Sequence, residues 1–201
     1  MSDTTPRNLT RKQLKQSRAD LTTDDCHRLS HAICERAKSL KLIEAHQHIA
    51  FYMPFNNEVD PAALLHYGLE HHKRCYLPIL DPEIPEQLVF ASFAADDPLV
   101  DNRYGIKEPI YHADNIIAPE MLELVFVPLV GFDVQGNRLG MGAGYYDRTF
   151  AFVKQSDAPI PRLIGLAYES QKITAIEPML WDVKLDGIIT EADFYSFKGQ
   201  P

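Results

Sequence analysis

The sequence has few cysteines, no long apolar run and no excess of basic residues, and each shortage excludes a class of protein. Its three cysteines are odd in number and lack close metal-type spacing, which argues against a disulfide framework and favours reduced, structural thiols. No apolar run approaches the roughly 20 residues of a membrane span. The polar residues 1–5 do not resemble a signal peptide. We therefore expect a cytoplasmic protein that binds no membrane.

Basic residues number 20 against 28 acidic ones, which gives a net charge of −8. This balance argues against a general nucleic-acid-binding surface, so we expect no nucleic-acid partner. It still permits a nucleotide ligand, because a phosphate site needs only local positive charge. A chain of 201 residues is long enough for one substantial core, and we expect a single domain spanning residues 1–201.

Two familiar phosphate-binding motifs are missing as well. A P-loop ends in Gly-Lys-Ser or Gly-Lys-Thr, and neither triplet occurs. The dinucleotide fingerprint spaces its glycines G-x-G-x-x-G, whereas residues 140–144 read G-x-G-x-G. Any nucleotide site in this chain is therefore of another kind.

The most informative segment that is present is residues 137–148, where Arg138 precedes three alternating glycines and Tyr-Tyr-Asp follows them. Glycines at every second position let a ligand approach the backbone, and successive N–H groups can converge on an anion. A helix beginning after Gly144 would add its positive N-terminal end. Asp147 is placed to hold a divalent cation beside phosphates. The segment predicts a nucleotide-phosphate site; the alternative is a tight connection in which Asp147 caps the following helix.

Alternation of strands and helices indicates the fold class. Helices are expected at 7–19, from a capping box at Thr22 to about 40, at 61–72 and at 145–154. Strands are expected at 48–53, 74–77, 87–93, 122–127, 162–167 and 187–190, with a loop-rich part at 94–120 and a turn at 133–137. The pattern predicts an α/β protein with three layers, α/β/α, around a mostly parallel sheet.

Residues 128–133, 136–140 and 142–148 together resemble the signature of the 5-formyltetrahydrofolate cyclo-ligase family, also called methenyltetrahydrofolate synthetases. Weaker matches in the right order are the basic pair Arg7 and Arg11, residues 104–109, and residues 181–186. The resemblance covers nearly the whole chain. It implies the fold shared with sugar-phosphate isomerases and CoA transferases. It also implies ATP- and Mg²⁺-dependent closure of 5-formyltetrahydrofolate to 5,10-methenyltetrahydrofolate through a phosphorylated formyl group, with release of ADP and phosphate.

The resemblance further implies roles for individual residues. The residues expected to bind ATP are Arg7, Arg11, Arg138, Leu139, Gly140, Met141, Gly142, Ala143, Gly144, Tyr145 and Tyr146. Those expected to bind the folate, which carries a polyglutamate tail in some forms, are Arg11, Met53, Glu58, Tyr104, Met141, Gly142, Ala143, Gly144 and Tyr145. Mg²⁺ is expected on Asp147 and Asp182, and Arg138 and Tyr145 are expected to act in catalysis. We expect a monomer.

Each of these roles has a plainer alternative. Arg7 and Arg11, four residues apart on one helical face, would also suit a solvated basic surface. Tyr145 and Tyr146 would also suit the core at a helix start. Glu58 and Asp182 would also suit ordinary loop acids, and the nearby Asp186 is easily confused with Asp182.

The chain departs from some family members at one position of the glycine segment. Ala143 stands where they carry lysine, which removes a positive charge from the phosphate site and leaves the affinity for ATP open; Arg148 is the residue that would compensate. Trp181 is expected to pack rather than bind. Two other functions stay open: a folate- or nucleotide-binding protein without turnover, and a different enzyme on the isomerase or CoA-transferase scaffold.

Overall fold

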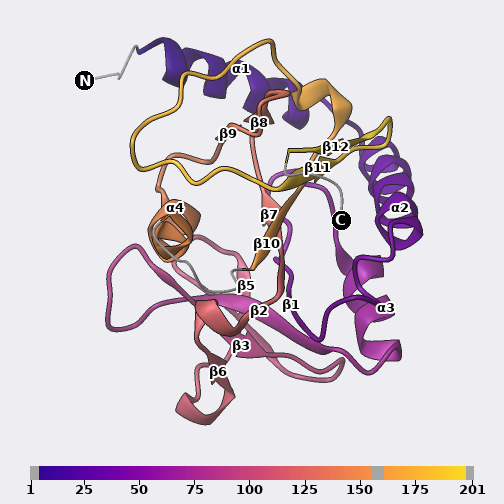
Figure 1. Cartoon of the computed structure of the whole chain (residues 1–201), viewed down its shortest axis with the longest axis vertical. Helices are drawn as coiled ribbons and strands as arrows, with labels where there is room; N and C mark the ends of the chain where they lie inside the picture. The colour runs from indigo at the N-terminus through magenta and orange to yellow at the C-terminus, as the bar shows by residue number, and fades with distance from the viewer. Residues whose placement is uncertain (1–4, 155–160, 198–201) are drawn as a thin grey trace.

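The computed structural model describes residues 5–154 and 161–197. Its centre is a sheet built from β1 (His48–Ala50), β2 (Arg74–Leu80), β3 (Leu88–Ser92), β6 (Ile116–Ile117), β7 (Leu124–Pro128), β10 (Arg162–Leu166), β11 (Gly187–Ile189) and β12 (Phe194–Ser196). The strand order is β12-β11-β10-β7-β1-β2-β3-β6 (Figure 1). The five strands from β11 to β2 are parallel, whereas β12, β3 and β6 pair antiparallel with their neighbours. The predicted mostly parallel sheet is confirmed.

Helices cover both faces of this sheet. α2 (Thr23–Ser39) and α3 (Ala62–Glu70) lie on one face and α4 (Tyr145–Thr149) on the other (Figure 1). In β7, Leu124 and Phe126 belong to the core beneath α2 and α3, while Val125 and Val127 belong to the core beneath α4. Because successive side chains of a strand point to opposite faces, a continuous apolar run fills both layers. The three-layer α/β/α arrangement is therefore also confirmed.

One further helix, α1 (Pro6–Ala19), crosses the end of the sheet over the hairpin of β8 (Gly131–Phe132) and β9 (Arg138–Leu139) (Figure 1). Leu14 of α1 packs in a small buried cluster with Val130 and Leu139. A Cβ at Gly131 would lie 2.4 Å from Leu14 Cδ1, so a larger residue there would force the Leu14 side chain to move. The basic face of α1 is thereby fixed against the segment that leads into the glycine-rich loop.

The predicted elements differ from the observed ones mainly where the strands are short. Residues 94–120 contain β4 (Leu99–Asp101) paired with β5 (Lys107–Pro109), two short 3-10 turns, η1 (Ala113–Asn115) and η2 (Pro119–Met121), and β6. The hairpin β8/β9 and β12 were not predicted either, because two or three residues are too few to show an alternating pattern. The predicted helix 145–154 is wrong in length: α4 stops at Thr149 and a 3-10 turn, η3 (Ala151–Lys154), follows.

None of the helices in residues 5–154 and 161–197 combines the length and apolar character needed to cross a bilayer.

Candidate active site

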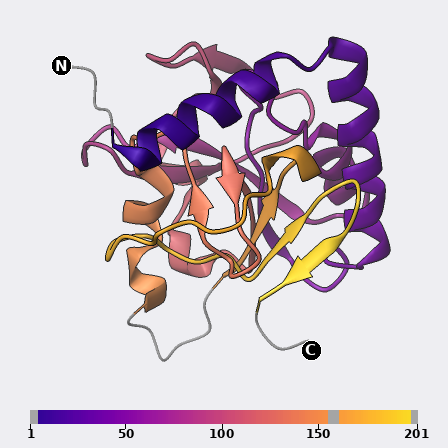
Figure 2. The ribbon, with the colours of Figure 1, turned by 90° about the horizontal axis from the view of Figure 1, so that it is seen from above.

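The sheet topology brings three loops together at the carboxyl ends of neighbouring strands. β1 and β7 are parallel neighbours, so the segment after β1, which holds Met53 and Glu58, emerges beside the segment after β7, which leads to the glycine loop (residues 140–144). The chain between η4 (Glu169–Gln171) and β11 then loops past α1 and α4, as both views show (Figures 1 and 2). The carboxyl edge of a parallel sheet is the usual ligand-binding edge in α/β proteins.

The turn before the glycine loop is held by a buried aspartate. Asp133 Oδ1 accepts hydrogen bonds from the backbone N–H groups of Gln135 (2.9 Å) and Asn137 (3.1 Å). Its Oδ2 accepts from Asn137 Nδ2 (2.9 Å) and from the Ile176 N–H (2.8 Å). The turn predicted at 133–137 is thus confirmed, and it also anchors the segment after η4. These bonds fix the backbone that leads into Arg138, the first residue of β9.

Arg138 is buried at the centre of the site. Its Nη1 donates to the Val183 carbonyl oxygen, and its Nη2 forms an ion pair with Asp147 Oδ1 at 3.0 Å. Asp147 Oδ1 also accepts from the Val183 N–H at 3.0 Å. The Asp147 side chain therefore faces the Val183 segment rather than capping α4, whose N-cap position is Gly144 without any side-chain cap. The alternative reading of Asp147 as a cap is wrong.

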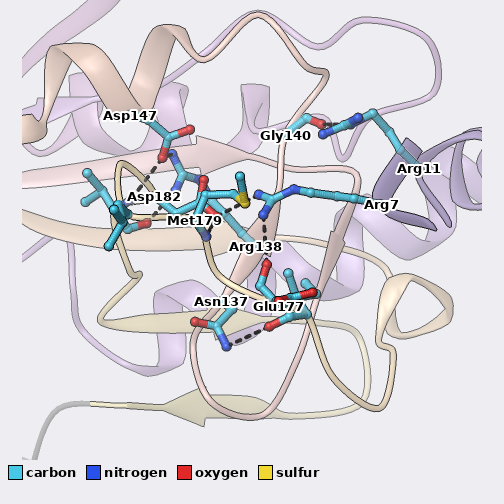
Figure 3. Close-up of polar contacts among 12 residues, drawn as sticks. Arg7, Arg11, Asn137, Arg138, Gly140, Asp147, Glu177, Met179 and Asp182 are labelled. Carbon is cyan, nitrogen blue, oxygen red and sulfur yellow. Dashed lines mark hydrogen bonds and ion pairs between the residues drawn. The ribbon is translucent and has the colours of Figure 1, made fainter. Parts of the chain in front are cut away.

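Asp182 lies beside this pair and is held by the first turn of α1. Arg7 Nη2 donates to Asp182 Oδ2 at 2.7 Å, and Arg7 Nη1 donates to the Glu177 carbonyl oxygen at 2.9 Å (Figure 3). The Met179 N–H donates to the same carboxylate oxygen at 2.9 Å. Asp186, by contrast, is buried and accepts from the Leu163 N–H at 2.7 Å at the start of β10. The structure thus separates Asp182, at the site, from Asp186, which supports the sheet.

Asp147 and Asp182 offer carboxylate oxygens, which suit a small divalent cation. Each of these carboxylates also has an arginine partner. Among the described residues no group of three or more His, Cys, Asp or Glu side chains could hold a metal ion. The contacts of these carboxylates run through Asp147 Oδ1 and Asp182 Oδ2. Mg²⁺ needs only one or two carboxylates when phosphates and waters complete its octahedron. The residues present therefore fit Mg²⁺ bound together with a nucleotide rather than Mg²⁺ alone.

The glycine loop is bound on one side by α1 and on the other by Arg148. Arg11 Nε donates to the Gly140 carbonyl oxygen at 2.9 Å, and Lys15 Nζ donates to that of Met141 at 3.2 Å. Arg148 donates to the Ala143 carbonyl oxygen, so its charge does lie at the loop where some family members carry lysine. α4 has only five residues, too few for the strong helix dipole that the sequence suggested. Positive charge at the loop comes from arginine and lysine side chains instead.

Backbone conformation explains two of the three glycines. Gly142 has φ of 116° and Gly144 has φ of 72°, values that L-residues with a Cβ rarely adopt. A Cβ at Gly144 would also meet the Arg148 guanidinium at 3.0 Å. Met141, Gly142 and Ala143 are exposed, so the loop presents backbone to a ligand.

Glu58 is almost completely buried, which makes the reading of a plain loop acid wrong. Its Oε1 lies 3.4 Å from Arg18 Nη1, and its Oε2 accepts from the Phe55 N–H at 3.2 Å. Burial raises the pKa of the Glu58 carboxyl, while the neighbouring Arg18 charge opposes that shift. Met53, from the same segment, is half-buried and packs against the core.

The tyrosines form two different environments. The hydroxyls of Tyr104 and Tyr145 are 3.1 Å apart, and their rings meet edge to face at 6.2 Å between centroids. Arg103 donates to the Tyr145 hydroxyl and lies over the Tyr104 ring. Burial raises the pKa of Tyr145, whereas the hydrogen bond with Tyr145 lowers that of Tyr104. Tyr104 is 47% exposed, and its role as a wall for the folate stays a prediction.

Tyr146 faces inward. It stacks on Phe150 at 6.2 Å and packs against the α4-side core, and burial raises the pKa of its hydroxyl strongly. The charge of Glu58 adds to that rise, and the charge of Arg138 opposes it. The alternative in which Tyr146 packs in the core is confirmed for its ring, and its contact with ATP stays a prediction.

A pocket of about 360 Å³ opens next to Tyr145 and Arg103. Its other lining residues come from the carboxyl end of β2, the β2–β3 connection, the β4–β5 connection and β5, and are Leu80, Asp81, Pro82, Pro85, Glu86, Gln87, Asn102 and Glu108. Tyr145 thus takes part both in this pocket and in the contact with Tyr104.

The sequence did not reveal two features of the site. Arg18 was only one of four basic residues at 3–4 spacing on α1, yet it is 3% exposed and contacts Glu58. Its burial depends on tertiary packing, although the spacing itself was a visible signal. Trp181 was expected to pack, but it is 61% exposed beside Asp182, so that expectation is wrong.

Comparison with known proteins yields one family. A family model described as the 5-formyltetrahydrofolate cyclo-ligase family matches residues 3–191. A Haemophilus influenzae protein named 5-formyltetrahydrofolate cyclo-ligase is 36% identical over 189 residues, covering 93% of this chain and 98% of the relative. The Escherichia coli K12 protein of the same name is 27% identical over 184 residues, covering 92% of this chain and 100% of the relative.

Solved structures give the same result. A 5,10-methenyltetrahydrofolate synthetase from Aquifex aeolicus superposes with a TM-score of 0.82 at 27% identity, covering 98% of this chain and 95% of its own. A synthetase of the same name from Mycoplasma pneumoniae gives a TM-score of 0.71 at 28% identity, covering 93% and 99%. Both likenesses extend over more than nine-tenths of this chain.

Proposed function

The chain belongs to the 5-formyltetrahydrofolate cyclo-ligase family, and from this premise we propose that it closes 5-formyltetrahydrofolate to 5,10-methenyltetrahydrofolate at the expense of ATP. Mg²⁺ is the proposed cofactor, and ADP and phosphate are the proposed by-products. We further propose that residues 1–201 act as one domain, as a cytoplasmic monomer, and that the folate is accepted with or without a polyglutamate tail.

The observation that carries the proposal is the cluster of charges around the glycine loop. Arg11 contacts Gly140, while Arg7 and Arg138 are each paired with a carboxylate, Asp182 and Asp147. Guanidinium groups bind phosphate oxygens bidentately, and carboxylates suit Mg²⁺. The site thus holds cations for a triphosphate and anions for its metal within one set of contacts.

The reaction needs activation because a formamide is a poor electrophile and its oxygen a poor leaving group. In the proposed sequence the formyl oxygen attacks the terminal phosphorus of ATP, and the bond to ADP breaks. The second folate nitrogen, N10, then attacks the formyl carbon and loses its proton, and the carbon–oxygen bond breaks as phosphate leaves. The protein supplies position and electrostatic stabilisation and needs no nucleophile of its own.

Arg138 is the residue that we place against the charge that develops on the transferred phosphoryl group. Its side chain is 5% exposed, and a charge excluded from water acts more strongly than one on the surface. The Tyr145 hydroxyl, fixed by Arg103 and Tyr104, is proposed to orient the formyl group. Bound at Asp147 and Asp182, Mg²⁺ would neutralise the phosphates and polarise them.

Glu58 is proposed to recognise the folate ring. The pterin presents an amino group and a ring N–H, which are donors that one carboxylate can accept together. Met53, the glycine loop, Tyr104 and Tyr145 are proposed to enclose the rest of the folate. Such an apolar enclosure with a few fixed polar groups is the usual make-up of a small-molecule site.

The test is to mix purified protein with 5-formyltetrahydrofolate, ATP and Mg²⁺ and to follow the near-ultraviolet absorption of the methenyl product. We expect product to form, to match released phosphate in amount, and to require both ATP and Mg²⁺. Asp147→Asn should abolish it, whereas the matched surface variant Asp24→Asn should not. Folded wild-type protein that binds the folate without turnover would instead favour the non-catalytic binding protein.

A further inference from the structure

We infer that Arg18 is a positioning residue for the folate half of the site, joining the Glu58 carboxylate to the glycine loop. The inference rests on the proposed function, since it takes Glu58 as the pterin contact. Arg18 is the last of five basic residues of α1, after Arg7, Arg11, Lys12 and Lys15, and it alone is fully buried among them.

The contacts of Arg18 reach three segments that are far apart in the chain. Nη1 lies 3.4 Å from Glu58 Oε1 and donates to the Leu129 carbonyl oxygen at 3.3 Å. Nη2 lies 3.9 Å from the Met141 sulfur. The segments after β1 and after β7 and the glycine loop therefore meet at one guanidinium. Displacing it would move Glu58, whereas the glycine loop keeps its bonds to Arg11, Lys15 and Arg148.

A second set of bonds fixes the backbone around the pair. Asn57 Nδ2 donates to the carbonyl oxygens of Arg18 and Leu21, each at 3.2 Å. The Glu58 side chain is thus held from both sides, by Arg18 Nη1 and by the Phe55 N–H. Long side chains rarely receive this much support unless their exact position matters.

Stability alone does not explain why an arginine occupies this place. Arg18 Nε is buried and has no hydrogen-bond partner among the described residues. An orphaned buried donor destabilises a fold, and well-packed apolar residues often replace a buried ion pair without loss. A pair that leaves one donor unpaired is therefore better explained by what it does for the ligand site.

The charged and titratable groups that face Glu58 come from several elements. Arg18 and Lys15 of α1 oppose burial by stabilising the ionised form, while Tyr52 after β1 and Tyr146 of α4 lie within electrostatic range. The pterin donors need an ionised acceptor. Removing the Arg18 charge should therefore raise the pH above which Glu58 is ionised and can accept the pterin hydrogen bonds. It should also hold the Glu58 side chain less firmly.

The test compares Arg18→Met and Arg18→Lys with wild type, using KM for each substrate and the pH profile of kcat/KM for the folate. We expect Arg18→Met to raise KM for 5-formyltetrahydrofolate at least tenfold and KM for ATP less than twofold. The acid limb of the folate profile should move to higher pH. Arg18→Lys keeps the charge but not the two-pronged geometry of the guanidinium. Its acid limb should therefore return to the wild-type pH, whereas its KM for the folate should lie between those of wild type and Arg18→Met.

Equilibrium dialysis of the folate without ATP gives a readout that is independent of turnover and should show the same loss of affinity. The double variant Arg18→Met/Glu58→Gln should be no weaker than Glu58→Gln alone, because the two residues act as one unit. Equal changes in both KM values, an unmoved acid limb, or multiplying losses in the double variant would overturn the inference.

Two further outcomes keep the result interpretable. If Arg18→Met fails to fold, Arg18→Lys decides alone, through a raised folate KM with an unchanged ATP KM. If wild type forms no methenyl product, the proposed function fails; if wild type turns over and the Arg18 variants match it, only the positioning role fails.

Discussion

Arg7 and Asp182, 175 positions apart in the chain, form an ion pair of 2.7 Å that joins the first turn of α1 to the loop before β11. Arg138 and Asp147 form a second pair of 3.0 Å beside it. Each proposed metal ligand is thus neutralised by a proposed phosphate ligand. When a nucleotide binds with its metal, both ion pairs can separate. Each arginine then binds phosphate and each carboxylate binds the cation, so that no buried charge is left without a partner.

The first prediction tests this exchange at α1. Arg7→Ala should raise KM for ATP roughly 10-fold, since a charge-assisted hydrogen bond contributes about 1.5–3 kcal/mol and this one is partly exposed to solvent. It should also strengthen Mn²⁺ binding measured without nucleotide, because Asp182 loses its arginine partner. Lys12→Ala, which removes an exposed positive charge from the same helix, should do neither. A weaker rather than stronger Mn²⁺ signal in Arg7→Ala would count against the exchange.

The second prediction separates the two aspartates of residues 181–186. Asp182→Asn should raise the Mg²⁺ concentration needed for half-maximal rate at least several-fold and lower stability less than Asp186→Asn does, because the Arg7–Asp182 pair is partly exposed. Asp186→Asn should weaken the acceptor of the buried Leu163 N–H and lower stability by about 1–3 kcal/mol, with no change in the Mg²⁺ requirement. Mg²⁺ titration and thermal unfolding of both variants check this. The assignment fails if the two phenotypes are reversed.

The third prediction concerns the pH dependence of folate use. Burial raises the pKa of Glu58 above its ordinary value, which is about 4.3. Since the pterin needs the ionised form, kcat/KM for the folate should fall as the pH drops through that raised pKa and stay constant above it. Glu58→Gln should lower kcat/KM roughly 10- to 150-fold, the loss of one charge-assisted hydrogen bond. It should also remove this acid limb, which a pH series on both proteins will show.

The sequence could predict what depends on local pattern. The continuous apolar run at 122–127 predicted a strand buried on both faces, and Leu124 to Val127 are indeed divided between the two cores. The capping box predicted the start of α2, and the Thr22 hydroxyl accepts from the Asp25 N–H. In both cases residues that are neighbours in the chain decide the outcome.

What depends on contacts between distant segments could not be predicted from pattern. The spacing on α1 predicted a basic face, but not that Arg18 would be buried beside Glu58, 40 residues later. The sequence of residues 181–186 did not show whether Asp182 or Asp186 belongs to the site. Only the contact of Asp186 with Leu163 of β10 distinguishes the two. Trp181 was expected to pack, yet it is 61% exposed, whereas the next residue, Asp182, is bound by Arg7.

The fourth prediction addresses the alanine in the glycine loop. Ala143→Lys should lower KM for ATP several-fold, because Ala143 is exposed in the loop that we propose to bind the phosphates and an added ammonium contributes about 0.3–1 kcal/mol beside phosphates. Arg148→Ala should raise KM for ATP, since its guanidinium contacts the Ala143 carbonyl oxygen. Steady-state kinetics give KM for ATP in both variants, and isothermal titration with ATP and Mg²⁺ gives the corresponding affinities. Equal affinities for ATP in wild type, Ala143→Lys and Arg148→Ala would mean that neither residue 143 nor residue 148 lies close to the phosphates.

The last prediction uses the hydroxyl pair at the rim of the site. Tyr145→Phe removes the hydroxyl that contacts both Arg103 and Tyr104, whereas Tyr104→Phe removes only the outer partner and keeps the edge-to-face rings. If the Tyr145 hydroxyl orients the formyl group, Tyr145→Phe should lower kcat about 10- to 100-fold with little change in folate KM, since the hydroxyl acts in the transition state. Tyr104→Phe should lower kcat less than fivefold, because the ring rather than its hydroxyl forms the wall. Steady-state kinetics of the two variants distinguish these roles. A larger loss of kcat in Tyr104→Phe than in Tyr145→Phe would transfer the orienting role to Tyr104, whose hydroxyl has the lowered pKa.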